Sequence, residues 1–257
     1  MHAFIAAGGI PKADEPLYLL THGINKALLP IAGKPMIQWV LDAASSSGVI
    51  ESITVIGLDQ QSGLHSKLPL RFIPNQGSLV LNVRAGAKLI KDFYPDADLL
   101  MALPADIPAV TPQIITSMTQ LFHQTNHDIY YSVVEKSVME ERFPGSKRTY
   151  ISLRDKTLCG GDIHAVRLAA ALNEKALYND LFNARKNPLK QAALVGLDVL
   201  LLLLLKRLTL EEAAQRISQR LGIRARAVIC PYAEAGMDVD KPFQHSLVEA
   251  DMLSRKI

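Results

Sequence analysis

Cysteine is scarce in this sequence, and its scarcity limits the chemistry open to the chain. The two cysteines, Cys159 and Cys230, lie far apart and form neither a Cys-x-x-Cys pair nor a zinc-binding spacing with histidine. We therefore expect two reduced, buried thiols and neither a disulfide nor a zinc site. Because reduced thiols are typical of the cytoplasm, we predict a cytoplasmic location.

Long hydrophobic runs are also missing. A membrane-spanning helix needs about 20 apolar residues, and the nearest candidate, residues 192–205, is shorter and contains Gly196 and Asp198. We expect that run to form a buried helix. The N-terminus has no basic head followed by an apolar core, so we expect no export signal and no membrane partner.

Neither sign of charge is in large excess, since 28 Lys and Arg residues oppose 25 Asp and Glu residues and leave a net charge of +3. So small an excess does not indicate a nucleic-acid partner, although it is compatible with anionic phosphate substrates. Arg216, Arg220, Arg224 and Arg226 have no aromatic residues among them, and a solvated face explains them more simply than a nucleic-acid surface.

The glycine pattern of NAD-binding proteins is absent as well. Residues 4–7 form an apolar run typical of a buried strand, but Gly8 and Gly9 are not followed by the Gly-x-Gly-x-x-Gly spacing, which disfavours an NAD-dependent enzyme. A glycine turn after a buried strand still lets backbone N–H groups approach phosphate oxygens closely. Gly8 and Gly9 are therefore candidates for binding phosphate.

Short apolar runs alternate with segments of helical periodicity, which predicts an α/β fold with a mostly parallel sheet flanked by helices. The strand, helix, strand order near the N-terminus favours a right-handed crossover between parallel strands. Expected strands cover residues 4–7, 52–57, 70–74, 98–103, 128–135, 149–153 and 225–231, and expected helices cover 35–46, 79–92, 111–124 and about 242–253.

Residues 165–221 are expected to be almost entirely helical. The pattern predicts helices over 166–172, 175–186, 189–205 and 209–221, and a Thr209–Glu212 capping box opens the last of them. We expect this region to be a helical insertion, forming a C-terminal helical layer in a single domain over residues 1–257.

One stretch carries a family resemblance. Residues 4–41 read FIAAGGIPKADEPLYLLTHGINKALLPIAGKPMIQWVL and contain AAGG followed by Lys-x-Leu-x-Pro-Ile-x-Gly-Lys-Pro-Met. This pattern resembles the nucleotidyltransferases with an NTP transferase domain, which include molybdenum-cofactor guanylyltransferase and the sugar-1-phosphate uridylyltransferases. The resemblance implies a Rossmann-like fold of the nucleotide-diphospho-sugar transferase type. It also implies magnesium-dependent transfer of a nucleoside monophosphate from a nucleoside triphosphate to a phosphate-bearing acceptor, with release of pyrophosphate.

The resemblance assigns roles to residues around the glycine turn. It implies that Ala7, Gly8 and Gly9 bind the nucleotide phosphates and that Lys26 stabilises charge developing on the α-phosphate. The family usually has Gly-x-Gly-x-Arg in this loop, but no arginine lies between Gly8 and Lys26 here, and Lys12 is the nearest cationic substitute. Lys34 is expected to help Lys26 bracket the same pocket.

A second group of candidates follows the strand predicted over 70–74. In the resembled family the nucleotide base is read at this place, where Asn75, Gly77 and Ser78 stand here. An ordinary glycine and serine helix cap explains each of these residues about equally well.

Aspartates provide the candidate metal ligands. Asp106 follows the strand predicted over 98–103, where open α/β sheets bind ligands, and it resembles the family's magnesium ligand. The segment Asp238-Val-Asp240-Lys-Pro resembles the family's C-terminal acidic motif, in which Asp240 is the better match and Asp238 the reserve. At a strand's solvent-facing end, Asp106 is expected to contribute little to the core.

The acceptor side is less well marked. Gly160-Gly161-Asp162 resembles a Gly-Gly-Asn turn that lines the acceptor pocket in related enzymes, and Lys147 and Arg148 either meet the second substrate or form a solvated face. Two alternatives stay open. The missing loop arginine suits a nucleotide-binding sensor or pseudoenzyme, and a glycosyltransferase of the same fold would use a sugar nucleotide.

Overall fold

The computed structural model describes residues 1–173, 196, 199, 201–202 and 205–255. Its strands are β1 (His2–Ala6), β2 (Pro30–Ile31), β3 (Lys34–Pro35), β4 (Ser52–Ile56), β5 (Leu70–Ile73), β6 (Leu99–Pro104), β7 (Ile129–Glu135), β8 (Ile151–Ser152), β9 (Thr157–Gly160), β10 (His164–Arg167) and β11 (Ala225–Cys230). Its helices are α1 (Tyr18–Thr21), α2 (Met36–Ser46), α3 (Leu79–Phe93), α4 (Pro112–His123), α5 (Lys136–Arg142), α6 (Leu168–Ala171), α10 (Leu210–Leu221) and α11 (Pro242–Ser254), with 3-10 turns η1 (Lys26–Leu28), η2 (Gln60–Ser62) and η4 (Ala233–Gly236).

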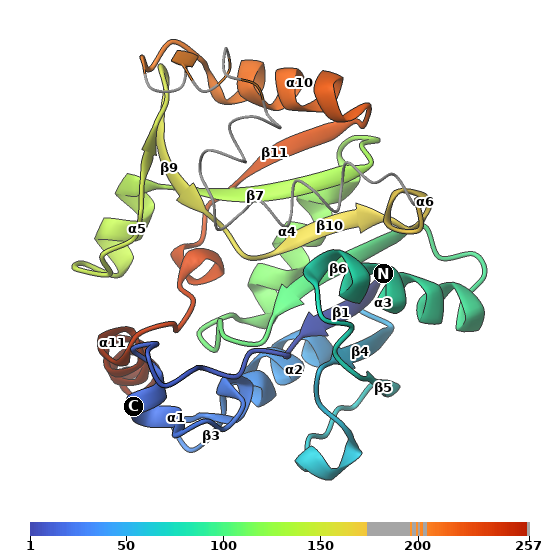
Figure 1. The fold of residues 1–257 in the computed structure, drawn as a ribbon, viewed down its shortest axis with the longest axis vertical. Coiled ribbons are helices and arrows are strands. Elements are labelled where there is room, and N and C mark those ends of the chain that lie inside the picture. Colours follow the sequence, from blue (N-terminus) through green and yellow to red (C-terminus); the bar gives the residue numbers. More distant parts are fainter. Residues whose placement is uncertain (174–195, 197–198, 200, 203–204, 256–257) are drawn as a thin grey trace.

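A mixed sheet runs through the centre of the molecule in the order β5-β4-β1-β6-β10-β7-β9-β8, with β11 beside β7 (Figure 1). The strands β5, β4, β1 and β6 are mutually parallel, so their carboxyl ends meet at one edge. Strand β10 runs antiparallel to both β6 and β7 and joins the parallel core to the rest of the sheet. The predicted α/β fold is confirmed, with a mixed sheet around a parallel core.

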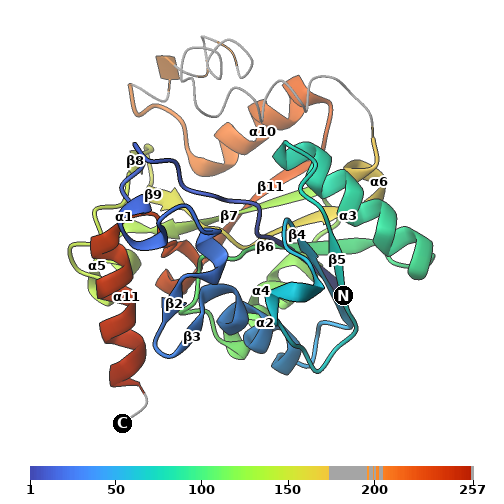
Figure 2. The same ribbon diagram turned by 60° about the horizontal axis from the view of Figure 1, so that its bottom comes forward.

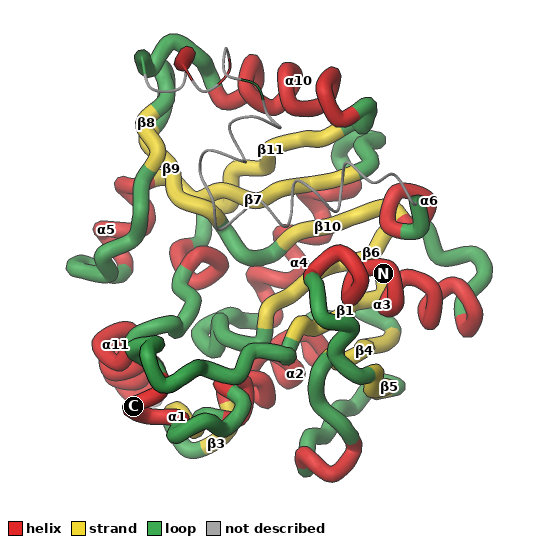
Figure 3. The backbone as a smooth tube through the Cα atoms, in the orientation of Figure 1, coloured by secondary structure: helices red, strands yellow, loops and turns green. Residues whose placement is uncertain are grey.

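Helices cover both faces of the parallel core (Figure 3). On one face, apolar residues of β1 and β6 pack with those of α2 and α4, as Ile5 and Met101 do with Leu41 and Ile115. On the other face, Leu100 packs with α3 and α6. Burial on both faces explains why these strands appear in the sequence as continuous apolar runs.

The last helix, α11, returns to the N-terminal part of the chain (Figure 2). The Glu249 carboxylate accepts a 3.1 Å hydrogen bond from the Ala32 N–H, and the His245 ring lies 2.8 Å from the Pro30 carbonyl oxygen. This docking holds the segment before α11, which contains Asp238 and Asp240, close to the carboxyl ends of the parallel strands.

The region predicted as helical from residue 165 begins instead with strand β10, and the helix predicted over 166–172 is confirmed only for α6 (Leu168–Ala171). Ile163 and Ala165 are fully buried whereas His164 and Val166 are partly exposed, and this alternation belongs to a strand. Four residues are too few for sequence periodicity to separate a strand from the start of a helix.

Only part of the predicted helical region can be compared with the structure. The predicted helix over 175–186 and most of the one over 189–205 fall outside the described residues. Helix α10 confirms the last one, including its Thr209–Glu212 capping box. None of the helices among the described residues combines the length and the apolar composition that a membrane span requires.

Candidate functional site

The glycine turn after β1 lies in backbone contact with the turn after β4. The N–H of Ala7 donates a 2.8 Å hydrogen bond to the Ile56 carbonyl oxygen. Gly57 has a φ of +100°, and a Cβ atom there would lie 2.5 Å from the Cα atom of Gly8. Only glycine fits at position 57, and sequence reasoning missed it, although its place directly after a buried strand was visible.

Lys26 is held against this turn by its neighbours. Its N–H donates a 2.9 Å hydrogen bond to the Gly9 carbonyl oxygen. The Asn25 side chain donates to the Ala7 carbonyl oxygen over 2.5 Å and accepts from the Ala27 N–H over 2.9 Å. Asn25 is therefore a second site residue that sequence reasoning missed, and its signal was an amide side chain directly before the motif lysine.

The Lys26 ammonium bridges two carboxylates from distant parts of the chain. Its Nζ atom lies 2.5 Å from Oδ2 of Asp106 and 2.6 Å from Oδ1 of Asp240. Burial alone would lower the pKa of Lys26, but the two carboxylates outweigh it and hold that pKa above its usual value. Lys26 is therefore a protonated cation at the carboxyl end of β6.

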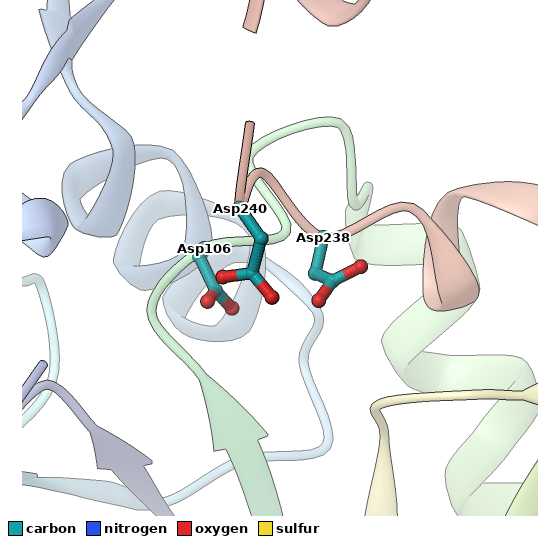
Figure 4. A group of neighbouring side chains, drawn as sticks. All are labelled: Asp106, Asp238 and Asp240. Carbon is teal, nitrogen blue, oxygen red and sulfur yellow. The ribbon is translucent and has the colours of Figure 1, made fainter. Parts of the chain in front are cut away.

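Asp106, Asp238 and Asp240, which we call the aspartate triad, offer oxygens that all lie within 4.8 Å of one another. Figure 4 shows their carboxylates side by side, one from the loop after β6 and two from the segment before α11. Asp106 is only 7% exposed, and its Oδ1 atom has no hydrogen-bond partner among the described residues. Carboxylate oxygens in this number, one of them buried and unsatisfied, fit a hard divalent cation such as magnesium.

Burial of Asp106 corrects one expectation. The sequence suggested a solvent-facing residue with little part in the core. In the structure Asp106 is buried, as are its neighbours Ala105 and Ile107. The loop after β6 turns inward beneath Val239, whose N–H donates to the Asp106 carbonyl oxygen over 2.9 Å.

A second cation, Arg148, pairs with a member of the triad. The Arg148 guanidinium forms an ion pair with Asp238, and its Nη2 atom lies 3.9 Å from Oδ2 of Asp162. Burial, reinforced by the nearby Asp106 carboxylate, raises the pKa of Asp162 to about 7. Arg148 thus lies in the site and not on a solvated face.

The residues after β5 close the other side of the glycine turn. The Asn75 amide nitrogen lies 3.5 Å from the Gly8 carbonyl oxygen, and its Oδ1 accepts from the Gly77 N–H over 3.0 Å and from the Asn82 side chain over 3.1 Å. Ser78 caps α3 by accepting a 3.2 Å hydrogen bond from the Leu81 N–H. A cavity of about 490 Å³ opens beside Asn75, between Gly57, Leu58, Phe72 and neighbouring residues.

The two other candidate lysines, Lys12 and Lys34, have surroundings that differ from those of Lys26. Lys12 is exposed in the loop before α1, where its N–H donates to the Glu15 carboxylate over 3.1 Å. Lys34 does not share the pocket of Lys26, because it pairs with Asp42 and its Nζ lies 3.8 Å from the Trp39 ring centroid. Lys34 instead lines a separate cavity of about 310 Å³ between α2, α4 and α11.

The chain is similar to known proteins in sequence and in overall fold. Residues 21–227 match the family model described as the MobA-like NTP transferase domain. A hypothetical transferase from Thermus thermophilus of known structure is 34% identical, with a TM-score of 0.80 over 95% of this chain and 100% of that one. CMP:2-keto-3-deoxy-manno-octonic acid synthetase complexed with CTP is 16% identical, with a TM-score of 0.61 over 99% of this chain and 98% of that one, which shows a shared fold.

A curated relative matches part of the chain. The bifunctional protein GlmU of Thermosipho africanus is 27% identical over 134 residues, which are 50% of this chain and 27% of that protein. The match thus spans about a quarter of the relative's length.

Proposed function

Because the chain belongs to the family of MobA-like NTP transferase domains, we propose that it transfers a nucleoside monophosphate from a nucleoside triphosphate to a phosphate-bearing acceptor. The observation that carries the proposal is the Lys26 ammonium between Asp106 and Asp240, at the carboxyl end of β6 and against the glycine turn. Open α/β sheets bind their ligands at this edge.

The reaction proposed is an in-line displacement at the α-phosphorus. An oxygen of the acceptor phosphate forms the new P–O bond, the bond to the β-phosphate bridging oxygen breaks, and pyrophosphate leaves with that electron pair. Such a transfer depends on positioning and on neutralising charge more than on a protein acid or base. The chain therefore needs cations and N–H donors around the phosphates.

Each part of the site has a proposed task. Backbone N–H groups of Ala7, Gly8 and Gly9 bind phosphate oxygens, and Lys26 stabilises negative charge developing on the α-phosphate. A magnesium ion held by Asp106 and Asp240, with Asp238 beside them, would supply Lewis-acid neutralisation of the phosphate oxygens.

The cavity beside Asn75 is the proposed place of the nucleotide base. Its floor is apolar where Leu28, Leu58 and Phe72 contribute, which suits the face of a base. Asn75 and Gly77 are tied to each other and to the Gly8 turn, so they link the base side of the site to the phosphate side. Ser78 is the N-cap of α3, the helix that begins at this side of the cavity.

The acceptor is proposed to approach from the side of Arg148 and the Gly160–Asp162 turn. Lys12, exposed in the loop before α1, is a proposed contact for the outer phosphates of the triphosphate. We further propose that residues 1–257 act as one domain and work in the cytoplasm, where Cys159 and Cys230, both buried and not paired in a disulfide, would stay reduced.

Pyrophosphate release separates this function from its rivals. The purified protein is mixed with each common nucleoside triphosphate, magnesium and a panel of phosphorylated small molecules. A nucleotidyltransferase releases pyrophosphate with one combination. A sensor binds a triphosphate without releasing pyrophosphate, and a glycosyltransferase ignores triphosphates but consumes a sugar nucleotide.

A further inference from the structure

Two cationic side chains of the chain itself already offset part of the negative charge of the aspartate triad. Lys26 bridges Asp106 and Asp240, and Arg148 pairs with Asp238. Every carboxylate that would hold a divalent cation therefore has a cationic partner within the chain. The Lys26 ammonium lies where a cation shared by Asp106 and Asp240 would have to lie, since its distances to them are 2.5 and 2.6 Å.

The Lys26 ammonium does not contact all of the carboxylate oxygens at this position. Lys26 contacts Oδ2 of the buried Asp106 carboxylate, whereas Oδ1 has no hydrogen-bond partner among the described residues. A hard divalent cation takes six or more oxygen ligands and can use several oxygens of the triad at once. The triad is thus built for a cation of higher coordination than an ammonium.

The Lys26 side chain is also able to move. Its backbone is fixed by hydrogen bonding to Gly9, but its ammonium is a compact charge on a flexible four-carbon stem. A short swing about that fixed backbone would carry the ammonium from the triad toward the glycine turn, where the phosphates of a bound triphosphate would lie.

We propose that Lys26 is a displaceable counter-ion: it fills the divalent-cation position while the site is free of nucleotide, and a bound triphosphate draws it away. This inference rests on the proposed function, because it assumes that a triphosphate binds at the glycine turn. Two cations cannot share the position between Asp106 and Asp240, since their charges repel. The divalent cation therefore binds weakly to the free protein and tightly together with the nucleotide.

The two binding events are then linked in both directions. If the triphosphate raises the affinity for the divalent cation by some factor, the cation raises the affinity for the triphosphate by the same factor. Removing the ammonium should remove much of this linkage, because the cation no longer has to compete for its place.

Binding of Mn²⁺, without nucleotide, tests the inference directly. Titration calorimetry compares the wild-type protein with Lys26→Gln and with the matched control Lys34→Gln, whose lysine is also half-buried and paired with an aspartate. Lys26→Gln should bind Mn²⁺ at least tenfold more tightly than the wild type, and Lys34→Gln should match the wild type. Asp240→Asn should lose this binding. If Lys26→Gln does not fold, Lys26→Met, which keeps the apolar stem, replaces it.

A second titration adds a methylene-bridged analogue of the triphosphate that stabilises the protein most. The analogue should tighten Mn²⁺ binding to the wild type at least tenfold and tighten it less in Lys26→Gln. Equal Mn²⁺ affinities of wild type and Lys26→Gln, with normal analogue binding, would overturn the counter-ion inference alone. A wild-type protein that binds no triphosphate analogue would overturn the proposed function together with it.

Discussion

The N–H of Val239 donates a 2.9 Å hydrogen bond to the carbonyl oxygen of Asp106, and this single backbone contact joins the loop after β6 to the segment before α11. It places Asp238 and Asp240, which flank Val239 in sequence, beside Asp106. This main-chain contact holds the two segments that carry the three aspartates next to each other. Substituting one carboxylate should therefore leave the positions of the other two unchanged.

Substitution of Asp106 should separate its roles in binding and stability. Asp106→Asn keeps the volume of the side chain but removes the negative charge that pairs with Lys26 and would hold magnesium. Nucleotide binding should therefore lose its magnesium dependence. Because Asp106 is buried, we also expect a loss of about 1–3 kcal/mol in the free energy of unfolding. Calorimetric nucleotide titrations with and without magnesium, together with urea unfolding, measure both effects.

Asp42→Asn is the control for that variant, since Asp42 pairs with Lys34 at a more exposed position. It should cost no more than about 1 kcal/mol and leave nucleotide binding unchanged. Magnesium-dependent binding that persists in Asp106→Asn would show that Asp106 is only a turn residue.

Gly57 should tolerate no side chain. In Gly57→Ala the new Cβ would lie 2.5 Å from the Cα of Gly8, so the glycine turn must shift. Gly63→Ala is the matched control because Gly63 also has a positive φ, +69°, but faces open space. We expect about 1 kcal/mol of destabilisation from the positive φ in both variants and about 1–3 kcal/mol more in Gly57→Ala from the clash. Urea unfolding that gives equal losses would refute the close approach of the two turns.

The stability of the protein should fall in mild acid partly because of His164. Its ring stacks on Tyr131, and its Nδ1 atom faces the Ser132 N–H, which suits a neutral imidazole. Burial lowers the pKa of His164 to about 4. The unfolded chain therefore takes up a proton near its usual pKa of about 6.5, which the folded protein takes up only near 4.

Above about pH 6.5 the His164 ring is neutral in both states, and its contribution to the free energy of unfolding is fully present. That contribution is lost as the pH falls toward 4, because the unfolded chain takes up the proton first. Between pH 7 and pH 5 the wild type should lose on the order of 1–2 kcal/mol more than His164→Gln, which does not titrate there. Urea unfolding at the two pH values measures the difference. An identical loss in the two proteins would mean that the pKa of His164 is the same in the folded protein as in the unfolded chain.

The sequence predicted the central site through its motifs and not through periodicity. Lys26 and Asp240 are 214 residues apart, and nothing in the local pattern of either segment brings them together. Their proximity was expected only because both segments resemble parts of one family. The roles of these residues in binding and catalysis stay predictions.

Features without a local signal were missed. Strand β10 is short and antiparallel, so its pairing with β6 and β7 depends on tertiary contacts that no short pattern encodes. For Arg148 the sequence left two interpretations open, a contact with the second substrate or a solvated face, because its closest partner, Asp238, lies 90 residues away. Lys34 was placed in the wrong pocket because the start of α2 directs its side chain toward Asp42 and Trp39.

Release of pyrophosphate by Lys26→Ala tests the central claim most directly. Lys26 is proposed to stabilise charge that develops only during the reaction, so the variant should bind the triphosphate but lose about 2–4 kcal/mol of transition-state stabilisation. With the triphosphate and acceptor that give pyrophosphate with the wild type, turnover should fall by roughly 30- to 1,000-fold while calorimetric triphosphate binding persists. A Lys26→Ala protein that releases pyrophosphate at the wild-type rate would contradict the account.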